Sequence, residues 1–368
     1  MKYYIIAGEA SGDLHGSNLI AALKTKDPYF EARGWGGPLM QQQGMSLAKH
    51  YKDLAFMGFI EVALNLKTIL NNLAFCKKDI LQYNPDTLIL IDYPGFNLRI
   101  AKWAKQHEIK VLYYISPQIW AWKQSRVYTI KKCVDSMYVI LPFEKPFYAR
   151  FNYDVTYVGH PLLDAIEKFN LQEHGKAVKT NKPILALLPG SRQQEIKTML
   201  PIMLQAAKQL PQFHCVIAGA PAITPEFYNQ LIKGYEVTVL YNKSYPILKQ
   251  ATAALVTSGT ATLETALFHV PQIVCYKGNK LSYYIARQLI KIKYISLVNL
   301  IMDKPLVTEL IQDNLTANAL VQTLNHMLLP DQLKLLMAEY NALTTMLGNS
   351  GASQVAANAM YNYLLQSK

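Results

Sequence analysis

Residues able to do chemistry stand in short polar turns, each placed directly after an apolar run. The first turn, residues 8–16, has three ionisable side chains within seven residues, which favours a site over a plain glycine turn. Its candidate site residues are Glu9, Ser11, Gly12, Asp13 and His15. Backbone N–H groups at a helix start can hold an anion or a sugar hydroxyl. The alternative is that Asp13 only caps the following helix.

The second turn, residues 92–97, follows an apolar run at 87–91. Asp92 stands at the end of this expected strand among aromatic side chains. Burial there would raise the pKa of its carboxyl and suit it to general-base chemistry. Asn97 is a candidate for substrate binding in the same turn. The alternative is an Asx turn ahead of Pro94, which needs no ligand.

A third stretch, residues 116–126, places two tryptophans beside cationic side chains. Aromatic faces next to Lys or Arg can bind a sugar, a base or a protein interface. Trp120, Trp122 and Arg126 are therefore candidates for substrate binding. The alternative is that the tryptophans only pack in the core.

Residues 188–192 end another apolar run with the sequence Leu-Pro-Gly-Ser-Arg. The backbone donors of Gly190 and Ser191, together with the guanidinium of Arg192, suit the oxygens of a phosphate.

A fifth turn, residues 258–264, follows the run at 253–256 and opens a helix. Small residues at Ser258, Gly259 and Thr260 would let a diphosphate approach the N-terminal amides. Glu264, one turn in, could accept hydrogen bonds from ribose hydroxyls. The alternative makes Ser258 and Thr260 helix caps and Glu264 an ordinary first-turn acid. Because this turn and residues 188–192 fall in one half of the chain, together they favour a nucleotide diphosphate.

Several familiar motifs are missing from the sequence. It contains neither Gly-x-Gly-x-x-Gly nor the Walker pattern, so ordinary dinucleotide and P-loop sites lose support. No Asp-x-Asp pair stands in an expected strand-end turn, and no His or Cys cluster has the spacing of metal ligands. We therefore expect no metal ion and no cofactor.

The elements that must position these turns alternate along the chain. Short apolar runs separated by helical periodicity are typical of βαβ units and parallel sheets. The runs lie at residues 3–7, 87–91, 111–115 and 137–141 and, after a polar stretch, at 184–188, 215–218, 237–240, 253–256 and 272–275. We predict two α/β domains joined near residues 165–182, and a final helix after a break at 348–351. Ligands bind beyond the carboxyl ends of parallel strands, where these turns would lie.

The composition indicates a globular chain with anionic partners. Of 368 residues, 51% are hydrophobic and 17% charged, which excludes a disordered chain. The net charge of +12 favours nucleic acid, nucleotide phosphates or an acidic membrane surface. The 4 cysteines show no Cys-x-x-Cys spacing, which suits a reducing cytoplasm, and the N-terminal apolar run is too short for a secretory signal. No run approaches the ~18–20 residues of a membrane-spanning helix.

Two further stretches are candidates for contact with lipid. Residues 56–75 are apolar around most of a helix, and residues 276–297 are basic and amphipathic without one acidic residue. The respective alternatives are a core helix and a solvated face.

Seven motifs, in order along nearly the whole chain, resemble those of the lipid-A-disaccharide synthase family. They read GEASGD, DYPGFN, SPQIWAWKQSR, LPFEKPFY, VGHPLLD, LPGSR and SGTATLE. The resemblance implies a GT-B glycosyltransferase, with two Rossmann-like domains facing a cleft and a C-terminal helix packing back on the N-terminal domain. The N-terminal domain, residues 1–165, would bind the lipid acceptor and contain the catalytic aspartate. The C-terminal domain, residues 166–345, would bind the UDP-sugar, and residues 346–368 would form the returning helix.

The resemblance also implies roles for single residues. Asp92 and Arg192 match the family's essential aspartate and arginine. Asn299 lies in Ser-Leu-Val-Asn-Leu, where the family usually has Ser-Leu-Pro-Asn-Leu, and is expected to contact substrate. Many members have a second acid where this chain has Gly95, so Asp92 would be the one carboxylate of its turn. The chemistry alone leaves Glu9, Asp13 and His15 as alternative bases.

The implied reaction joins UDP-2,3-diacylglucosamine to 2,3-diacylglucosamine 1-phosphate (lipid X) with inversion. The products are the β(1→6) disaccharide 1-phosphate of lipid A and UDP. We expect these lipids and an anionic membrane surface as partners, no nucleic acid, and a homodimer as the alternative to a monomer. The chain would act in the cytoplasm, peripherally on the inner membrane of a Gram-negative cell. The first alternative is another GT-B enzyme, such as a UDP-N-acetylglucosamine 2-epimerase, and the second a basic nucleic-acid-binding protein.

Overall fold

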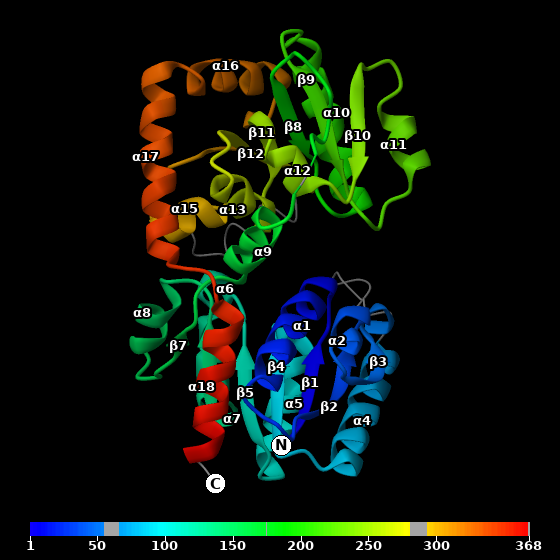
Figure 1. The fold of residues 1–368 in the computed structure, drawn as a ribbon, viewed down its shortest axis with the longest axis vertical. Helices are drawn as coiled ribbons and strands as arrows, with labels where there is room; N and C mark the ends of the chain where they lie inside the picture. Colours follow the sequence, from blue (N-terminus) through cyan, green and yellow to red (C-terminus); the bar gives the residue numbers. More distant parts are fainter. Residues whose placement is uncertain (55–65, 174, 280–292, 367–368) are drawn as a thin grey trace. The chain divides into compact units, whose positions relative to one another are not determined.

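The computed structural model describes residues 1–54, 66–173, 175–279 and 293–366. It divides the chain into two compact units (Figure 1). Unit 1 comprises Met1–Asp164 and Asn349–Lys368, and unit 2 comprises Ala165–Gly348. The chain therefore passes from one unit to the other after Asp164 and after Gly348, where the sequence led us to expect passages after residues 165 and 345.

Unit 1 is built on a seven-stranded parallel sheet with the order β3-β2-β1-β4-β5-β6-β7. Its central strand β4 is buried along its whole length, which explains the uninterrupted run Thr-Leu-Ile-Leu-Ile in the sequence. The strands are β1 (Lys2–Ala7), β2 (Glu31–Gly36), β3 (Ser46–His50), β4 (Thr87–Ile91), β5 (Lys110–Tyr114), β6 (Ser136–Val139) and β7 (Thr156–Tyr157). The helices are α1 (Ala10–Lys24), α2 (Pro38–Gln42), α4 (Leu66–Tyr83), α5 (Pro94–Gln106), α6 (Ile119–Trp122), α7 (Val127–Cys133), α8 (Glu144–Ala149) and α18 (Ala352–Gln366).

Unit 2 has a six-stranded parallel sheet with the order β10-β9-β8-β11-β12-β13. Its strands are β8 (Ile184–Leu188), β9 (His214–Gly219), β10 (Val237–Tyr241), β11 (Ala251–Thr257), β12 (Gln272–Tyr276) and β13 (Thr308–Ile311). Its helices are α10 (Gln193–Lys208), α11 (Pro225–Leu231), α12 (Ser244–Leu248), α13 (Thr260–Leu267), α15 (Leu297–Met302), α16 (Ala317–Met327) and α17 (Pro330–Leu347). Helix α9 (Pro161–Asn170) contains the first passage between the units.

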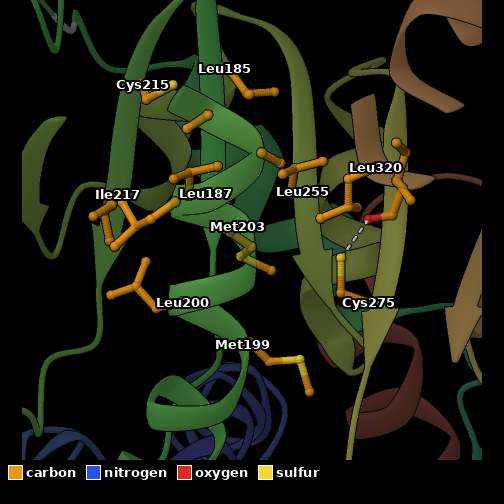
Figure 2. Close-up of a cluster of buried hydrophobic side chains, with 14 of the residues drawn as sticks. Leu185, Leu187, Met199, Leu200, Met203, Cys215, Ile217, Leu255, Cys275 and Leu320 are labelled. Carbon is orange, nitrogen blue, oxygen red and sulfur yellow. Dashed lines mark hydrogen bonds between the residues drawn. The ribbon is translucent and has the colours of Figure 1, made fainter. Parts of the chain in front are cut away.

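Helix α10 covers one face of the unit 2 sheet. Its buried residues Met199, Leu200 and Met203 follow helical spacing and point toward the side chains of β8, β9 and β11 (Figure 2). Leu187 and Leu255 belong to the same buried cluster. Strands β8 and β11 pair in parallel, so the turns after both strands lie at one edge of the sheet.

The expected fold is confirmed in class, in its two parallel sheets and in its C-terminal helix. Strands β2, β3, β7 and β13 were not predicted from the sequence. Strand β2 reads Glu-Ala-Arg-Gly-Trp-Gly, and β3 and β13 are mostly half-buried, so none of them contains a continuous apolar run. Strand β7 has two residues. Pairing with a neighbouring strand, and not their own hydrophobicity, places these segments in the sheets.

Helix α18 returns to unit 1 and packs against α1. The contact residues in one buried cluster are Leu19, Ile20 and Leu23 of α1 and Ala356, Ala357, Met360 and Leu364 of α18. Asp164 caps the start of α18, because its carboxylate accepts hydrogen bonds from the backbone N–H groups of Gly351 at 2.5 Å, Ala352 at 3.1 Å and Ser353 at 3.2 Å. One carboxylate thus joins the segment that leaves unit 1 to the segment that returns to it.

The two stretches proposed to contact lipid fall partly outside the described residues. Of residues 56–75, the structure describes the part that begins α4, and of residues 276–297 it describes only the two ends. Among the helices of the described ranges, none has the length and apolar character needed to cross a membrane.

The contacts of Asp164 predict that Asp164→Ala destabilises α18. The variant loses a charged cap, so the free energy of unfolding of unit 1 should fall by about 1–2 kcal/mol. Amide hydrogen exchange within α18 should accelerate to the extent that corresponds to this loss of free energy. The matched control is Glu167→Ala, an exposed position in the same helix α9. Unchanged protection of α18 in Asp164→Ala would contradict the assigned role.

Candidate active site

The first two polar turns lie next to each other at the carboxyl edge of the unit 1 sheet. Strands β1 and β4 pair in parallel, and their last residues, Ala7 and Ile91, are partners in the register. Glu9 and Asp92 follow these two strand ends. Their proximity is visible in the electrostatics, because the charge of Glu9 raises the pKa of Asp92.

Asp92 is held in a strained backbone conformation. Asp92 and the next residue, Tyr93, have φ angles of 45° and 48°, in the left-handed region that costs on the order of 1–3 kcal/mol per residue. Two side chains fix this turn, since the carbonyl oxygen of Asp92 accepts hydrogen bonds from the Tyr113 hydroxyl at 2.6 Å and from Nδ2 of Asn97 at 2.7 Å. Strain that is held in place by its neighbours is typical of functional sites.

Burial raises the pKa of Asp92 to about 6, and the charge of Glu9 contributes in the same direction. A hydrogen bond from the backbone N–H of Tyr93 works the other way. At neutral pH the carboxyl is therefore mostly ionised, yet it binds a proton more readily than an ordinary aspartate. This is the property needed in a general base.

The ring of Tyr93 lies directly on the first turn. A Cβ atom at Gly8 would come within 2.3 Å of Cγ of Tyr93, so only glycine allows this approach. The ring also packs near Phe96, with centroids 5.8 Å apart. The ring of Tyr93 thus fills the space between the first turn and Phe96, beside the half-buried Asp92.

Four candidates of the first turn have different surroundings. Asp13 is 2% exposed, and its carboxylate accepts hydrogen bonds from the backbone N–H groups of Gly37, Leu39 and Met40, at 2.9, 3.1 and 3.0 Å. The Asp13 carboxylate therefore holds the start of α2, and a role for it as base stays a prediction. Burial lowers the pKa of His15 to about 4, against an opposing effect of Asp164, so its imidazole is neutral at neutral pH. Ser11 is exposed and Gly12 is buried.

Asn97 and Trp120 also prove to be interior residues. Nδ2 of Asn97 donates to the backbone oxygens of Ile91 at 3.2 Å and Asp92 at 2.7 Å, so Asn97 positions the Asp92 turn. Trp120 is buried, and its ring meets that of Phe143 edge-on at 4.9 Å. Asn97 thus holds the Asp92 turn and Trp120 packs against Phe143, and contact of either residue with substrate stays a prediction.

Trp122 and Arg126 remain on the surface of unit 1. The Trp122 side chain is 47% exposed, and the guanidinium carbon of Arg126 lies 5.2 Å from its ring centroid. The ammonium of Lys123 lies 5.5 Å from the same ring. The expected pairing of an aromatic face with cations is therefore present and accessible.

In unit 2 the two phosphate-type turns border one cavity. Strands β8 and β11 are neighbours, and a cavity of about 480 Å³ lies beyond their carboxyl ends. Its lining includes Gly190, Ser191, Arg192, Glu195, Thr257, Ser258, Gly259, Thr260 and Glu264. All the residues that we proposed from the sequence for binding UDP are thus brought together.

The first of these turns begins helix α10. Gly190 has a φ of +119°, a conformation that favours glycine. Glu195 accepts hydrogen bonds from the backbone N–H groups of Ser191 and Arg192, which makes a capping box. The Arg192 side chain is 61% exposed and lines the cavity.

The second turn begins helix α13. Gly259 is its N-cap and offers no side chain for capping, so the helix start is open to an anion. The hydroxyl of Ser258 donates to the carbonyl oxygen of Ile295 at 2.8 Å and does not cap the helix. Oε1 of Glu264 accepts from the Tyr245 hydroxyl at 2.9 Å, and burial raises the pKa of Glu264.

Asn299 lies in the interior of unit 2. It is 1% exposed, Nδ2 donates to the oxygens of Val307 and Glu309, and Oδ1 accepts from the backbone N–H of Val307. Its side chain therefore joins α15 to β13. The structure thus shows a structural role for Asn299, and its contact with substrate stays a prediction.

Two residues that hold these turns, Tyr113 and Glu195, were not predicted from the sequence. Tyr113 belongs to an apolar strand, where nothing in the sequence marks it as the donor that holds Asp92. Glu195 stands three residues after an N-cap that is Arg192, and not Ser, Thr, Asp or Asn, so the usual sequence signature of a capping box is absent. Among the described residues no group of three His, Cys, Asp or Glu side chains is arranged to hold a metal ion, and metal independence stays a prediction.

The chain matches a family model across almost its whole length. The model of lipid-A-disaccharide synthetase matches residues 3–360. The lipid-A-disaccharide synthase of Syntrophus aciditrophicus (strain SB) is 40% identical over 364 residues, which cover 96% of this chain and 95% of that protein.

Solved structures with little sequence identity share the fold. The UDP-GlcNAc 2-epimerase from Neisseria meningitidis, bound to UDP-GlcNAc, has a TM-score of 0.70 at 12% identity and covers 98% of this chain and 100% of its own. The glycotransferase of kitacinnamycin has a TM-score of 0.67 at 12% identity, with 99% of each chain covered. At such identities the likeness shows the fold alone, and it confirms the expected GT-B architecture.

The seven sequence motifs and the family match agree, and neither the epimerase nor the nucleic-acid-binding alternative is favoured. The chain is an enzyme that takes a UDP-sugar as substrate. We conclude that it belongs to the lipid-A-disaccharide synthetase family of glycosyltransferases.

Proposed function

We propose that this enzyme condenses UDP-2,3-diacylglucosamine with lipid X to the β(1→6) lipid A disaccharide 1-phosphate and UDP. In the structure, this proposal rests on Asp92, whose side chain has a raised pKa and lies where strand β4 of unit 1 ends. The family match supports the choice of substrates. The reaction belongs to the biosynthesis of lipid A.

The chemistry assigns one task to each unit. Oxygen of the acceptor's 6-hydroxyl attacks the anomeric carbon of the donor, and the bond from that carbon to the diphosphate oxygen breaks. Asp92 accepts the hydroxyl proton, and UDP leaves with the bonding electron pair. Arg192 and the N-terminal amides of α13 at Gly259 and Thr260 stabilise the charge of the departing diphosphate. Attack from the side opposite the leaving group inverts the configuration.

Other residues of the two sites would bind parts of the substrates. Glu264 would accept hydrogen bonds from the ribose, because it lines the cavity of unit 2 beside the open start of α13. Trp122 and Arg126 would contact the acceptor through the exposed cationic and aromatic surface of unit 1. Ser11 and His15, which follow Glu9 in the first turn, would contact it near Asp92.

We also propose that the enzyme acts peripherally at an anionic membrane surface on the cytoplasmic side of the inner membrane. Both substrates carry acyl chains, and the net charge of +12 favours anionic lipid. The outward face of α4 supports this location, because Leu70 and Phe75 are 54% and 45% exposed there beside the exposed Lys67 and Lys78.

The reaction is tested by release of UDP from UDP-2,3-diacylglucosamine with and without lipid X, followed by mass analysis of the lipid product. We expect release that depends on lipid X and a disaccharide phosphate as product. In Asp92→Asn, turnover should fall by about 10³-fold or more while UDP binding stays within twofold, because Asn keeps the turn and cannot accept the proton. Near-normal turnover of this variant would contradict the role of Asp92, and release without lipid X would contradict the reaction.

The raised pKa of Asp92 predicts the pH dependence. Because the base must be ionised, kcat/KM should rise with pH, reach half its maximum near the pKa of about 6 and level off above neutrality. In Glu9→Gln the midpoint should move to lower pH, since one cause of the raised pKa is removed, but burial should keep it above the usual pKa of aspartate. Glu31→Gln, exposed in β2, is the control and should leave the midpoint unchanged. A midpoint unaffected by Glu9→Gln would exclude the proposed coupling.

Membrane association is tested by cosedimentation with vesicles of phosphatidylethanolamine and phosphatidylglycerol. Binding should weaken as salt rises from low to about 0.5 M, because screening shortens the reach of the protein's charge. Leu70→Ser should weaken binding at all salt concentrations by about tenfold, since an exposed leucine no longer inserts. Leu171→Ser, an equally large change at an exposed position of unit 2, serves as the control. Binding indifferent to both salt and Leu70 would count against the proposed surface.

A further inference from the structure

The carboxylate of Glu195 lies on the very donors that we assign to the diphosphate. Its Oε2 accepts hydrogen bonds from the backbone N–H of Ser191 at 3.1 Å and from that of Arg192 at 3.3 Å. Its Oε1 lies 3.6 Å from Nη1 of the Arg192 guanidinium. A carboxylate of the chain itself thus uses two backbone donors and part of the cation that a phosphate would use.

The turn is shaped around this carboxylate. Gly190 has a left-handed φ of +119°, and a Cβ there would lie 2.7 Å from Oε2 of Glu195 and 2.9 Å from its Cβ. Glu195 is also one of the residues that line the cavity of about 480 Å³. Its side chain is 35% exposed, so an anion that enters the cavity meets its charge.

The cavity has few charged side chains, so the contact between Glu195 and Arg192 affects how strongly the cavity attracts an anion. Among the described lining residues, Arg192 is the one cationic side chain, and Glu195 and Glu264 are the two carboxyl groups. The carboxyl group of Glu264 does not attract an anion, and burial raises its pKa. A nucleoside diphosphate therefore gains the full attraction of Arg192 only if Glu195 gives up its contacts.

We propose that Glu195 is an internal competitor of the diphosphate, which lowers the affinity of the site for UDP and so favours release of this product. The inference rests on the proposed function, because it takes UDP as the ligand of unit 2. Glu195 acts through the donors of the turn and is a positioning residue. If Glu195 served only as the capping residue of α10, the opposite result would follow, because loss of the carboxylate would loosen the turn and weaken UDP binding.

The test is calorimetric titration of the full-length enzyme and of Glu195→Gln with UDP and, separately, with inorganic pyrophosphate. Glutamine keeps the length of the side chain and one acceptor oxygen but removes the charge. We expect Glu195→Gln to bind both probes about tenfold more tightly, with a gain that shrinks as salt rises. UDP should also inhibit turnover of the variant at about tenfold lower concentration. Glu236→Gln makes the same change in net charge at an exposed position in unit 2 and should change neither Kd by more than twofold.

The outcomes separate this inference from the function on which it rests. Weaker or unchanged binding of both probes by folded Glu195→Gln overturns the competition and leaves Glu195 a helix cap. If the variant unfolds at a much lower temperature, Glu195→Asp replaces it, since the shorter side chain withdraws the carboxylate from the donors, and tighter binding is again required. A wild-type enzyme that binds pyrophosphate but not UDP contradicts the proposed nucleotide, while the effect of Glu195 on pyrophosphate still decides the competition.

Discussion

The parallel pairing of β1 with β4 is the constraint on which the site of unit 1 depends. It brings the ends of both strands to the same level, and so it sets the carboxyl groups of Glu9 and Asp92 near each other among aromatic rings. Burial and like charge then raise the pKa of Asp92. The chain must also turn sharply away from the sheet at this point, which explains the left-handed backbone at Asp92 and Tyr93.

Unit 2 uses the same arrangement of neighbouring parallel strands for different chemistry. The turns after β8 and β11 border one cavity, but here they present backbone N–H groups, an open helix start and a guanidinium. Such groups attract anions, against the two carboxyl groups of Glu195 and Glu264 in the same cavity. The edge of unit 1 instead has the carboxyl groups of Glu9 and Asp92, and that of Asp92 binds a proton more readily than an ordinary aspartate. The two sheets are alike in topology, and the side chains at the strand ends decide what each edge can do.

Several polar residues that the sequence marked as candidates for chemistry serve the backbone of these turns. Asp13 holds the start of α2, Asn97 holds the carbonyl of Asp92, and Asn299 joins α15 to β13. The physical reason is common to all three. Next to the ends of strands and helices, backbone N–H and C=O groups lack partners within the element, and buried side-chain amides and carboxylates replace those partners. A motif therefore contains residues for both tasks, and residue type alone does not distinguish them.

The sequence by itself determined the α/β class, nine of the strands, the final helix and the turns in which the site lies, because buried parallel strands must be apolar and the turns after them polar. Its motifs also identified the family. Only the tertiary structure decided the rest. Strands β2, β3, β7 and β13 depend on pairing, and the contacts of Tyr113 with Asp92 and of Asp164 with the start of α18 join residues far apart in the chain. Such contacts leave no local pattern, since neither the spacing nor the hydrophobicity of a segment records which distant groups will meet it.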